Sequence, residues 1–265
     1  MSPGDVVSNI VFDQHQWLEP QQTRFREVTY RNVAFSKLTL SRLTFSDCSF
    51  EDCIFVGTHF EEIDFHSCKF VNCNFWKARF RQVYLNPDTI KLEQRFKVEA
   101  ANTGISVFHA LLGNFAEERQ DEFYMQTDIL FKRWKRYQIW SDVRRKRIRW
   151  LPAFWRWLSS ITYECVAGFG YRPARFFLVT VVLFLVFSLL NYWVIGDAVK
   201  VDGVLVAHAT WVDTIFYTFS ILTVLGFSSI VPASECAKLI TVMEALMAIG
   251  WLGVFTSILV KRFLR

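Results

Sequence analysis

The sequence predicts a β plus α membrane protein in three parts: a repeat module, a helical connector and a membrane domain with two spanning helices. Three observations support this division. Apolar residues recur at every fifth position over residues 23–85, apolar residues follow helical spacing over residues 88–140, and two long apolar stretches lie near the C-terminus. The composition of 52% hydrophobic and 17% aromatic residues fits a small soluble module joined to a minimal membrane domain.

The repeat module is defined by large apolar residues at every fifth position. They are Phe25, Tyr30, Phe35, Leu40, Phe45, Phe50, Phe55, Phe60, Phe65, Phe70, Phe75, Phe80 and Leu85. A mostly small or apolar residue precedes each by two positions, as Val28, Val33, Cys48 and Cys53 do. Neither a helix nor a flat strand has this period. The pattern resembles the pentapeptide-repeat family, and this resemblance implies a right-handed quadrilateral β-helix over residues 23–87.

In that family four pentapeptides form one square coil, so residues 20 apart stack and both repeated positions point inward. The repeats here correspond to roughly three coils. Because each coil buries its inner residues against its neighbours, the ends of such a solenoid require caps. We expect residues 1–22, with Phe12, Trp17 and Leu18, to cap one end and the helical segment after Pro87 to cap the other.

Four cysteines occupy the inward positions of this module, and the charge of the module is nearly balanced. The stacked positions of Cys48, Cys53, Cys68 and Cys73 indicate small buried hydrophobes, since zinc sites use closer pairs such as Cys-x2-Cys. Residues 23–85 hold nine Lys or Arg against seven Asp or Glu. No acidic, DNA-like surface is therefore expected. We predict a cytoplasmic module for assembly, protein docking or gating, without a nucleic-acid partner.

Residues 88–146 are predicted to form a helical connector, in which Gly113-Asn114 separates two helices. Over residues 147–170 an apolar stripe at i, i+4, i+7, i+8 and i+11 predicts an amphipathic helix at the membrane interface. The stripe consists of Trp150, Phe154, Trp157, Leu158 and Ile161. Two readings stay open for this helix: transmission of movement to the membrane domain, or anchoring alone.

The membrane domain is predicted over residues 171–265, with spans at about 176–195 and 239–260. Both stretches are long enough to cross a bilayer, and Glu244 is the charged residue within them. Basic residues crowd the region between Lys132 and Arg149. The positive-inside rule therefore places both termini on the cytoplasmic side of a cell inner membrane, with the basic residues against anionic headgroups.

Between the spans, residues 211–222 have helical character, and Thr210-Trp211-Val212-Asp213 is a capping-box pattern. The run that follows resembles the pore loop of the potassium-channel family, with Pro232 at the family's proline. The resemblance implies a selectivity filter made of Thr223, Val224, Leu225, Gly226, Phe227 and Ser228. It further implies a pore helix, a homotetramer and permeant K⁺ or Na⁺, because one chain supplies one loop and the carbonyl ring needs four.

The run departs from the family pattern at several positions. Val224 replaces the threonine of the innermost ion site, and Ser228 replaces the second glycine. Ser220 and Ser229 occupy the positions where the family often has a bracing glutamate and aspartate. We expect Glu244 either to supply the missing carboxylate, with Ser220, Ser229 or Thr218 as partner, or to be hydrated near the outer headgroups.

These departures leave the ion selectivity open among weak potassium selectivity, mixed Na⁺/K⁺ conduction and sodium preference. In the second span, Gly250 is a candidate gating hinge, although helix packing is another use of glycine there. The alternative function is a non-conducting, membrane-anchored scaffold. No nucleophile with its base and no phosphate loop is visible in the sequence. Neither an enzyme nor a cofactor beyond the permeant cations is predicted.

Overall fold

A computed structural model describes residues 2–12, 22–195, 199–201, 204–206, 210–228 and 230–263. The chain forms two compact units, Met1–Ser160 and Ile161–Arg265, which are described separately. Ser229 lies outside the described residues, as do Trp17 and Leu18 of the predicted N-terminal cap.

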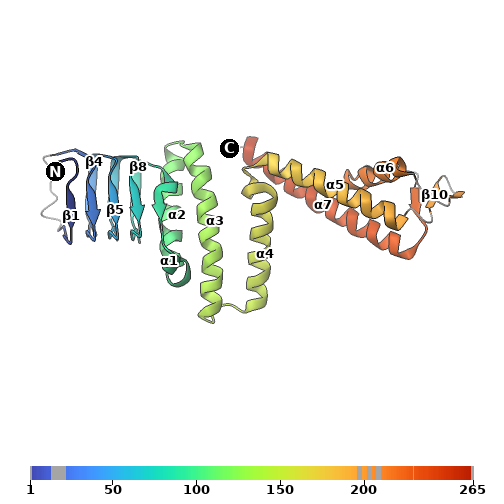
Figure 1. Cartoon of the computed structure of the whole chain (residues 1–265), viewed down its shortest axis with the longest axis horizontal. Coiled ribbons are helices and arrows are strands. Elements are labelled where there is room, and N and C mark those ends of the chain that lie inside the picture. The colour runs from blue at the N-terminus through green and yellow to red at the C-terminus, as the bar shows by residue number, and fades with distance from the viewer. Residues whose placement is uncertain are drawn as a thin grey trace. The chain divides into compact units, whose positions relative to one another are not determined.

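The first unit begins with a parallel β-solenoid, as the repeats predict (Figure 1). One sheet holds β1 (Val6–Ser8), β3 (Thr29–Arg31), β5 (Ser49–Glu51), β7 (Lys69–Val71) and β9 (Ile90–Lys91). The other holds β2 (Arg24–Arg26), β4 (Thr39–Ser46), β6 (His59–His66) and β8 (Arg79–Leu85). From β2 onward the partners are 20 residues apart, as Leu40, Phe60 and Phe80 are, whereas the partners between β1 and β3 are 23 apart. The solenoid is longer than the repeats predict, because β1 and β9 extend the sheet at its two ends.

Stacked side chains fill the solenoid. The ring of Phe50 stacks on that of Phe70 with centroids 4.8 Å apart, and Phe60 stacks on Phe80 at 4.9 Å. The four cysteines of the module are buried, as expected. The thiols of Cys68 and Cys73 each donate to a backbone carbonyl 23 residues earlier, at 3.3 Å. Hydrophobic burial over the whole length of the solenoid therefore forms the core of the first unit.

Three helices follow the last coil: α1 (Gln94–Glu99), α2 (Ala101–Glu117) and α3 (Asp121–Arg144). The predicted break at Gly113-Asn114 is wrong, because α2 runs through it and ends before Arg119, whose φ is 52°. Asn114 remains helical because its side chain bonds to the solenoid edge rather than to its own backbone. It accepts from Val83 N–H at 2.9 Å and donates to Val83 C=O at 2.8 Å.

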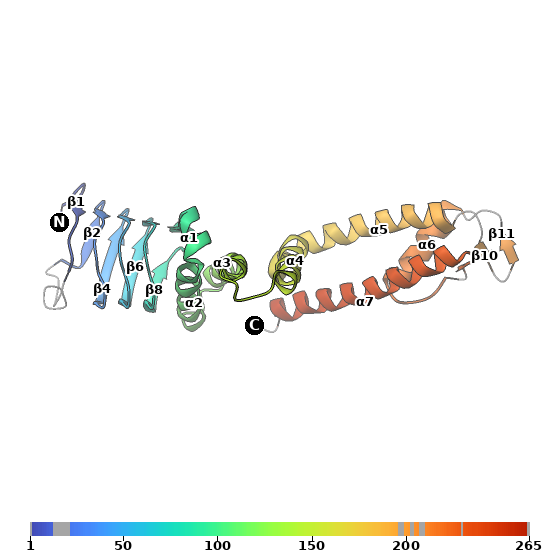
Figure 2. The ribbon, with the colours of Figure 1, turned by 90° about the horizontal axis from the view of Figure 1, so that it is seen from below.

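The next helix, α4 (Trp150–Ala167), covers most of the predicted amphipathic segment, and the 3-10 turn η2 (Gly168–Gly170) follows it. The second unit then contains α5 (Pro173–Ile195), α6 (Trp211–Leu222) and α7 (Glu235–Phe263). A small antiparallel sheet joins β10 (Val199–Val201) to β11 (Val204–Val206) and β12 (Ile230–Pro232). Among the residues that the structure describes, two helices are long and apolar enough to cross a membrane, at Pro173–Val194 and Glu235–Val260. Figure 2 shows α6 beside both of them.

Candidate pore site

The start of α6 is fixed by the predicted capping box. The Thr210 hydroxyl accepts a hydrogen bond from Asp213 N–H at 3.2 Å, and the Asp213 carboxylate accepts one from Thr210 N–H at 3.1 Å. These bonds satisfy donors that the first turn of a helix otherwise leaves unpaired. Helix α6 consequently begins at Trp211, where the sequence predicts it to begin.

The end of α6 is closed by a Schellman motif. Val224 N–H donates to Ile221 C=O at 2.9 Å, and Leu225 N–H donates to Ser220 C=O at 3.2 Å. This motif needs a residue in the left-handed region, which is usually glycine, and Val224 takes that conformation with φ 60°. A β-branched residue there is strained by about 1–2 kcal/mol. The first part of the predicted filter run therefore serves as the helix cap.

The carbonyl groups of the last turn of α6 accept hydrogen bonds from the run itself. The Thr223 hydroxyl donates to Phe219 C=O at 2.7 Å, and Gly226 N–H donates to Ser220 C=O at 3.3 Å. Gly226 lies at φ 66°, a conformation that glycine adopts without steric cost. These carbonyl groups are thus engaged in hydrogen bonds within the chain.

Ser220 also holds the far end of the run. Its hydroxyl oxygen accepts from Ser228 N–H at 3.1 Å, and the Ser228 hydroxyl accepts from Ile230 N–H at 3.1 Å. Ser220 is buried, so these bonds form away from solvent. The main chain of the run is consequently tied to α6 at Leu225, Gly226 and Ser228 through this one residue.

A second polar cluster connects α6 to both candidate spans. Glu244 of α7 is 1% exposed, so it is not hydrated at the surface of the unit. The Asn191 amide of α5 donates to the Glu244 carboxylate at 3.0 Å and to the Thr218 hydroxyl of α6 at 3.0 Å. Thr218 is one of the predicted partners, although it reaches Glu244 only through Asn191. Asn191 was not predicted, although a polar amide side chain inside an apolar span marks it in the sequence.

Three buried polar atoms in this part of the second unit have no hydrogen-bond partner among the described residues. They are Asn191 Oδ1, Glu244 Oε1 and Ser188 Oγ. A buried acceptor without a partner costs about 1–3 kcal/mol, so the bonds that Asn191 does make compensate only part of the burial of these groups.

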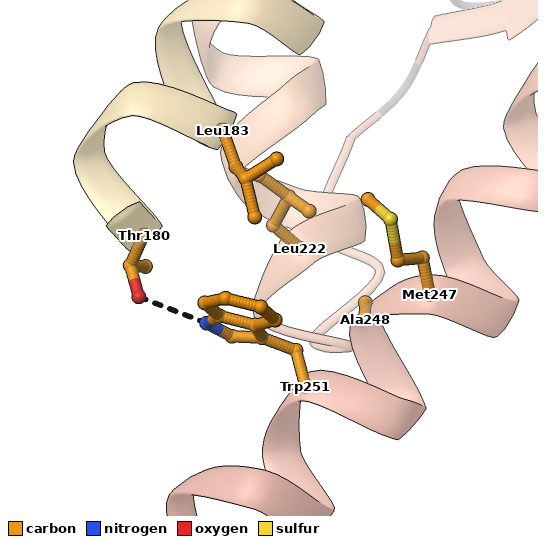
Figure 3. Close-up of a pocket in the computed structure, with 6 residues that line it drawn as sticks. All are labelled: Thr180, Leu183, Leu222, Met247, Ala248 and Trp251. Carbon is orange, nitrogen blue, oxygen red and sulfur yellow. Dashed lines mark hydrogen bonds between the residues drawn. The ribbon is translucent and has the colours of Figure 1, made fainter. Parts of the chain in front are cut away.

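A small apolar cavity lies where the end of α6 meets α5 and α7 (Figure 3). It has a volume of about 40 Å³ and is lined by Thr180, Leu183, Leu222, Met247, Ala248 and Trp251. The Trp251 indole N–H donates to the Thr180 hydroxyl at 2.8 Å. Next to Trp251, α7 runs without a break through Gly250, the predicted hinge.

Large apolar side chains of the run and of the spans are exposed in the single chain. Leu225 is 53% exposed and Phe227 is 71% exposed. In the most apolar stretch of each candidate span, 11% of the residues are buried within the single chain. Surfaces of this kind are covered by lipid or by other protein subunits in a membrane protein.

Comparison with known families gives two matches. Residues 176–265 match the family described as "Ion channel". Residues 5–85 match the family described as "SV2A/B/C luminal domain", a range that covers the strands from β1 to β8. No curated protein matches the chain. Together with the fold, these findings identify residues 176–265 as an ion channel domain that follows an N-terminal β-solenoid built from pentapeptide repeats.

Proposed function

We propose that this chain forms a homotetrameric cation channel in which α6 is the pore helix and the run from Thr223 to Ser228 is the pore loop. One observation carries the proposal: between two candidate spans, the buried Ser220 ties this run to the end of α6. A single run cannot enclose an ion, so the carbonyl ring requires several copies arranged about an axis. The exposure of Phe227 supports a neighbouring subunit there.

The proposed permeant ions are monovalent cations, K⁺ and Na⁺, with weak discrimination between them. Main-chain carbonyl groups replace the hydration shell of an ion in such a filter, and selectivity depends on how many groups contribute. Because Val224 closes the helix cap, the residues left to line the pore are Leu225, Gly226, Phe227 and Ser228. This part of the run is shorter than the six-residue filter suggested by the family pattern.

Two further roles belong to the same proposal. The cluster of Thr218, Asn191 and Glu244 braces α6 against α5 and α7, which holds the run in place. Gly250 provides a point at which α7 bends during gating, since glycine weakens a helix locally. A Cβ atom added at Gly250 would lie more than 4 Å from any atom of the single chain outside the adjacent turns of α7.

We also propose that both termini are cytoplasmic in a cell inner membrane and that the solenoid docks a protein partner. The basic residues between Lys132 and Arg149 favour this orientation and contact with anionic headgroups. The near balance of positive and negative charge in the solenoid argues against a nucleic-acid partner. No cofactor is required, because conduction depends on main-chain groups.

Planar-bilayer recording from the purified full chain tests conduction. We expect unitary currents whose reversal potential shifts little between symmetric KCl and a KCl/NaCl gradient. Cysteine modification then tests the site: Ser228→Cys, in a chain with Cys165 and Cys236 replaced by serine, is expected to be blocked by a methanethiosulfonate reagent. Ser159→Cys, on the exposed side of α4, is the matched control and is expected to conduct unchanged. Absence of current in every gradient would favour the membrane-anchored scaffold instead.

A further inference from the structure

A groove lies where the last coil of the solenoid meets α2, and Ala78, Ile105 and Ala110 belong to the apolar part of its lining. Trp76, Lys77 and Arg79 line it from the solenoid, and Asn102, Ser106 and His109 line it from α2. Lys77 N–H donates to the Ser106 hydroxyl at 3.4 Å, so the two walls touch at one edge. The groove has a volume of about 580 Å³, within the range of about 300–1,000 Å³ that is usual for small-molecule sites.

The cations of this groove are free to bind an anion. Lys77 and Arg79 are exposed, and neither forms an ion pair with another described residue. Elsewhere on the solenoid, Arg31 is paired with Glu51 of the next coil at 2.8 Å, and Arg42 is paired with Glu62 at 3.4 Å. The difference indicates that the charges in the groove are not used to hold neighbouring coils together.

The segments that form the groove contain no acidic side chains. The stacked segments 36–40, 56–60 and 76–80 contain Lys37, His59, Lys77 and Arg79 but no Asp or Glu, and residues 101–116 of α2 contain none either. None of the lining residues is acidic. Opposite charges within a few ångströms of the groove would cancel its attraction for an anion, so their absence strengthens that attraction.

We propose that this groove binds a nucleotide. Lys77 and Arg79 contact the phosphates, because a guanidinium and an ammonium bind phosphate oxygens through charge-assisted hydrogen bonds. Trp76 is 37% exposed and offers an indole face on which the base stacks. Asn102 and Ser106 supply hydrogen-bonding groups on the α2 side. A ligand held by both walls ties the solenoid to the first long helix of the connector.

Binding of a fluorescent ATP derivative to the purified full chain in detergent tests this proposal without reference to conductance. We expect Lys77→Ala/Arg79→Ala to weaken binding by at least about tenfold. The control Lys69→Ala/Arg81→Ala removes the same charge from exposed sites outside the groove and is expected to change binding by less than about twofold. Trp76→Ala is expected to weaken binding by about tenfold, while Trp76→Phe retains a ring and most of the affinity. Circular dichroism verifies that each variant is folded.

Four results would overturn the proposal. They are no binding of the ATP derivative, equal weakening by the groove and control pairs, full binding by the folded Trp76→Ala variant, and displacement by inositol hexakisphosphate but not by unlabelled ATP. Equal weakening would mean general attraction by a basic surface. Full binding without Trp76 would mean a phosphate site with no place for a base, and selective displacement by the inositol phosphate would mean a lipid-headgroup site.

Discussion

Asn191 offers a sharp test of the cluster that joins the three helices of the channel domain. Asn191→Ala removes two hydrogen bonds of 3.0 Å, to Thr218 and to Glu244, and leaves the buried Glu244 without a partner among the described residues. Hydrogen bonds between membrane helices contribute about 0.6 kcal/mol each on average, with a maximum near 1.7. Leaving a buried acceptor unpaired costs about 1–3 kcal/mol. We therefore expect a loss of roughly 1–3 kcal/mol in the free energy of unfolding.

The assay is unfolding of the purified chain in mixed micelles, monitored through tryptophan fluorescence. Ser188→Ala is the matched control, because Ser188 is buried one turn away on the same helix and its hydroxyl has no partner among the described residues. Removing an unpaired hydroxyl is expected to leave stability unchanged or to raise it.

A double-mutant cycle completes this test. In Asn191→Ala/Glu244→Leu both members of the pair become apolar, so the double variant is expected to be more stable than the sum of the single losses predicts. Equal effects of Asn191→Ala and Ser188→Ala, or additivity in the cycle, would refute the claim that Asn191 and Glu244 brace the domain. Open probability, recorded for the same variants, is expected to change for Asn191→Ala and not for Ser188→Ala.

Three further predictions concern local features. Val224→Gly relieves the left-handed strain after the end of α6 and is expected to raise the free energy of unfolding by about 0.5–1 kcal/mol, whereas Val212→Gly, at an exposed site within α6, is expected to lower it; a loss in both would contradict the strain. Burial raises the pKa of the Tyr30 phenol and, with the neighbouring Cys53, that of the Cys73 thiol. As the pH rises, the unfolded chain therefore loses these protons at a lower pH than the folded chain does. Urea unfolding should show a free energy of unfolding that falls as the pH rises above about 9, and a flat profile would contradict this. Asn114→Ala breaks both bonds to Val83 and should cost about 1–3 kcal/mol by the same assay; an effect no larger than that of Asn102→Ala, an exposed site on the same helix, would contradict this.

The solenoid and helix α6 were predictable because their signals are local. A five-residue period places every inward side chain, and the register of 20 residues follows, as Leu40, Phe60 and Phe80 illustrate. The start of α6 follows from the Thr210 capping box. Strand β1 was not predicted because it is out of phase with the later repeats, and its partners in β3 lie 23 rather than 20 residues away. Helix α2 continues through Gly113-Asn114 for a tertiary reason, since Asn114 bonds to the solenoid.

The sequence predicted only part of the candidate site, because some of its contacts join residues that lie far apart in the chain. Glu244 is recognisable in the sequence as a carboxyl group in an apolar stretch. Its partner Asn191 lies 53 residues away on another helix, and the spacing of residues along the chain does not reveal such a contact. The resemblance to the potassium-channel pore loop places Val224 at a filter position. The structure also gives it the left-handed position of the Schellman motif, which the sequence did not reveal because the usual glycine signal of a helix end is missing there.

The contacts of α6 determine how the run is coupled to the rest of the domain. Thr218 and Ser220 are two positions apart on the helix, so their side chains point to different sides of it. One side is bonded to α5 and α7 through Asn191, and the other is bonded to the main chain of the run. Because α6 is a regular helix between these positions, a displacement of α7 at Glu244 moves or strains the run rather than being absorbed by a flexible loop. A movement of α7 and the conformation of the run are therefore linked through the hydrogen-bonded side chains of Glu244, Asn191 and Thr218, followed by a two-residue step along α6 to Ser220.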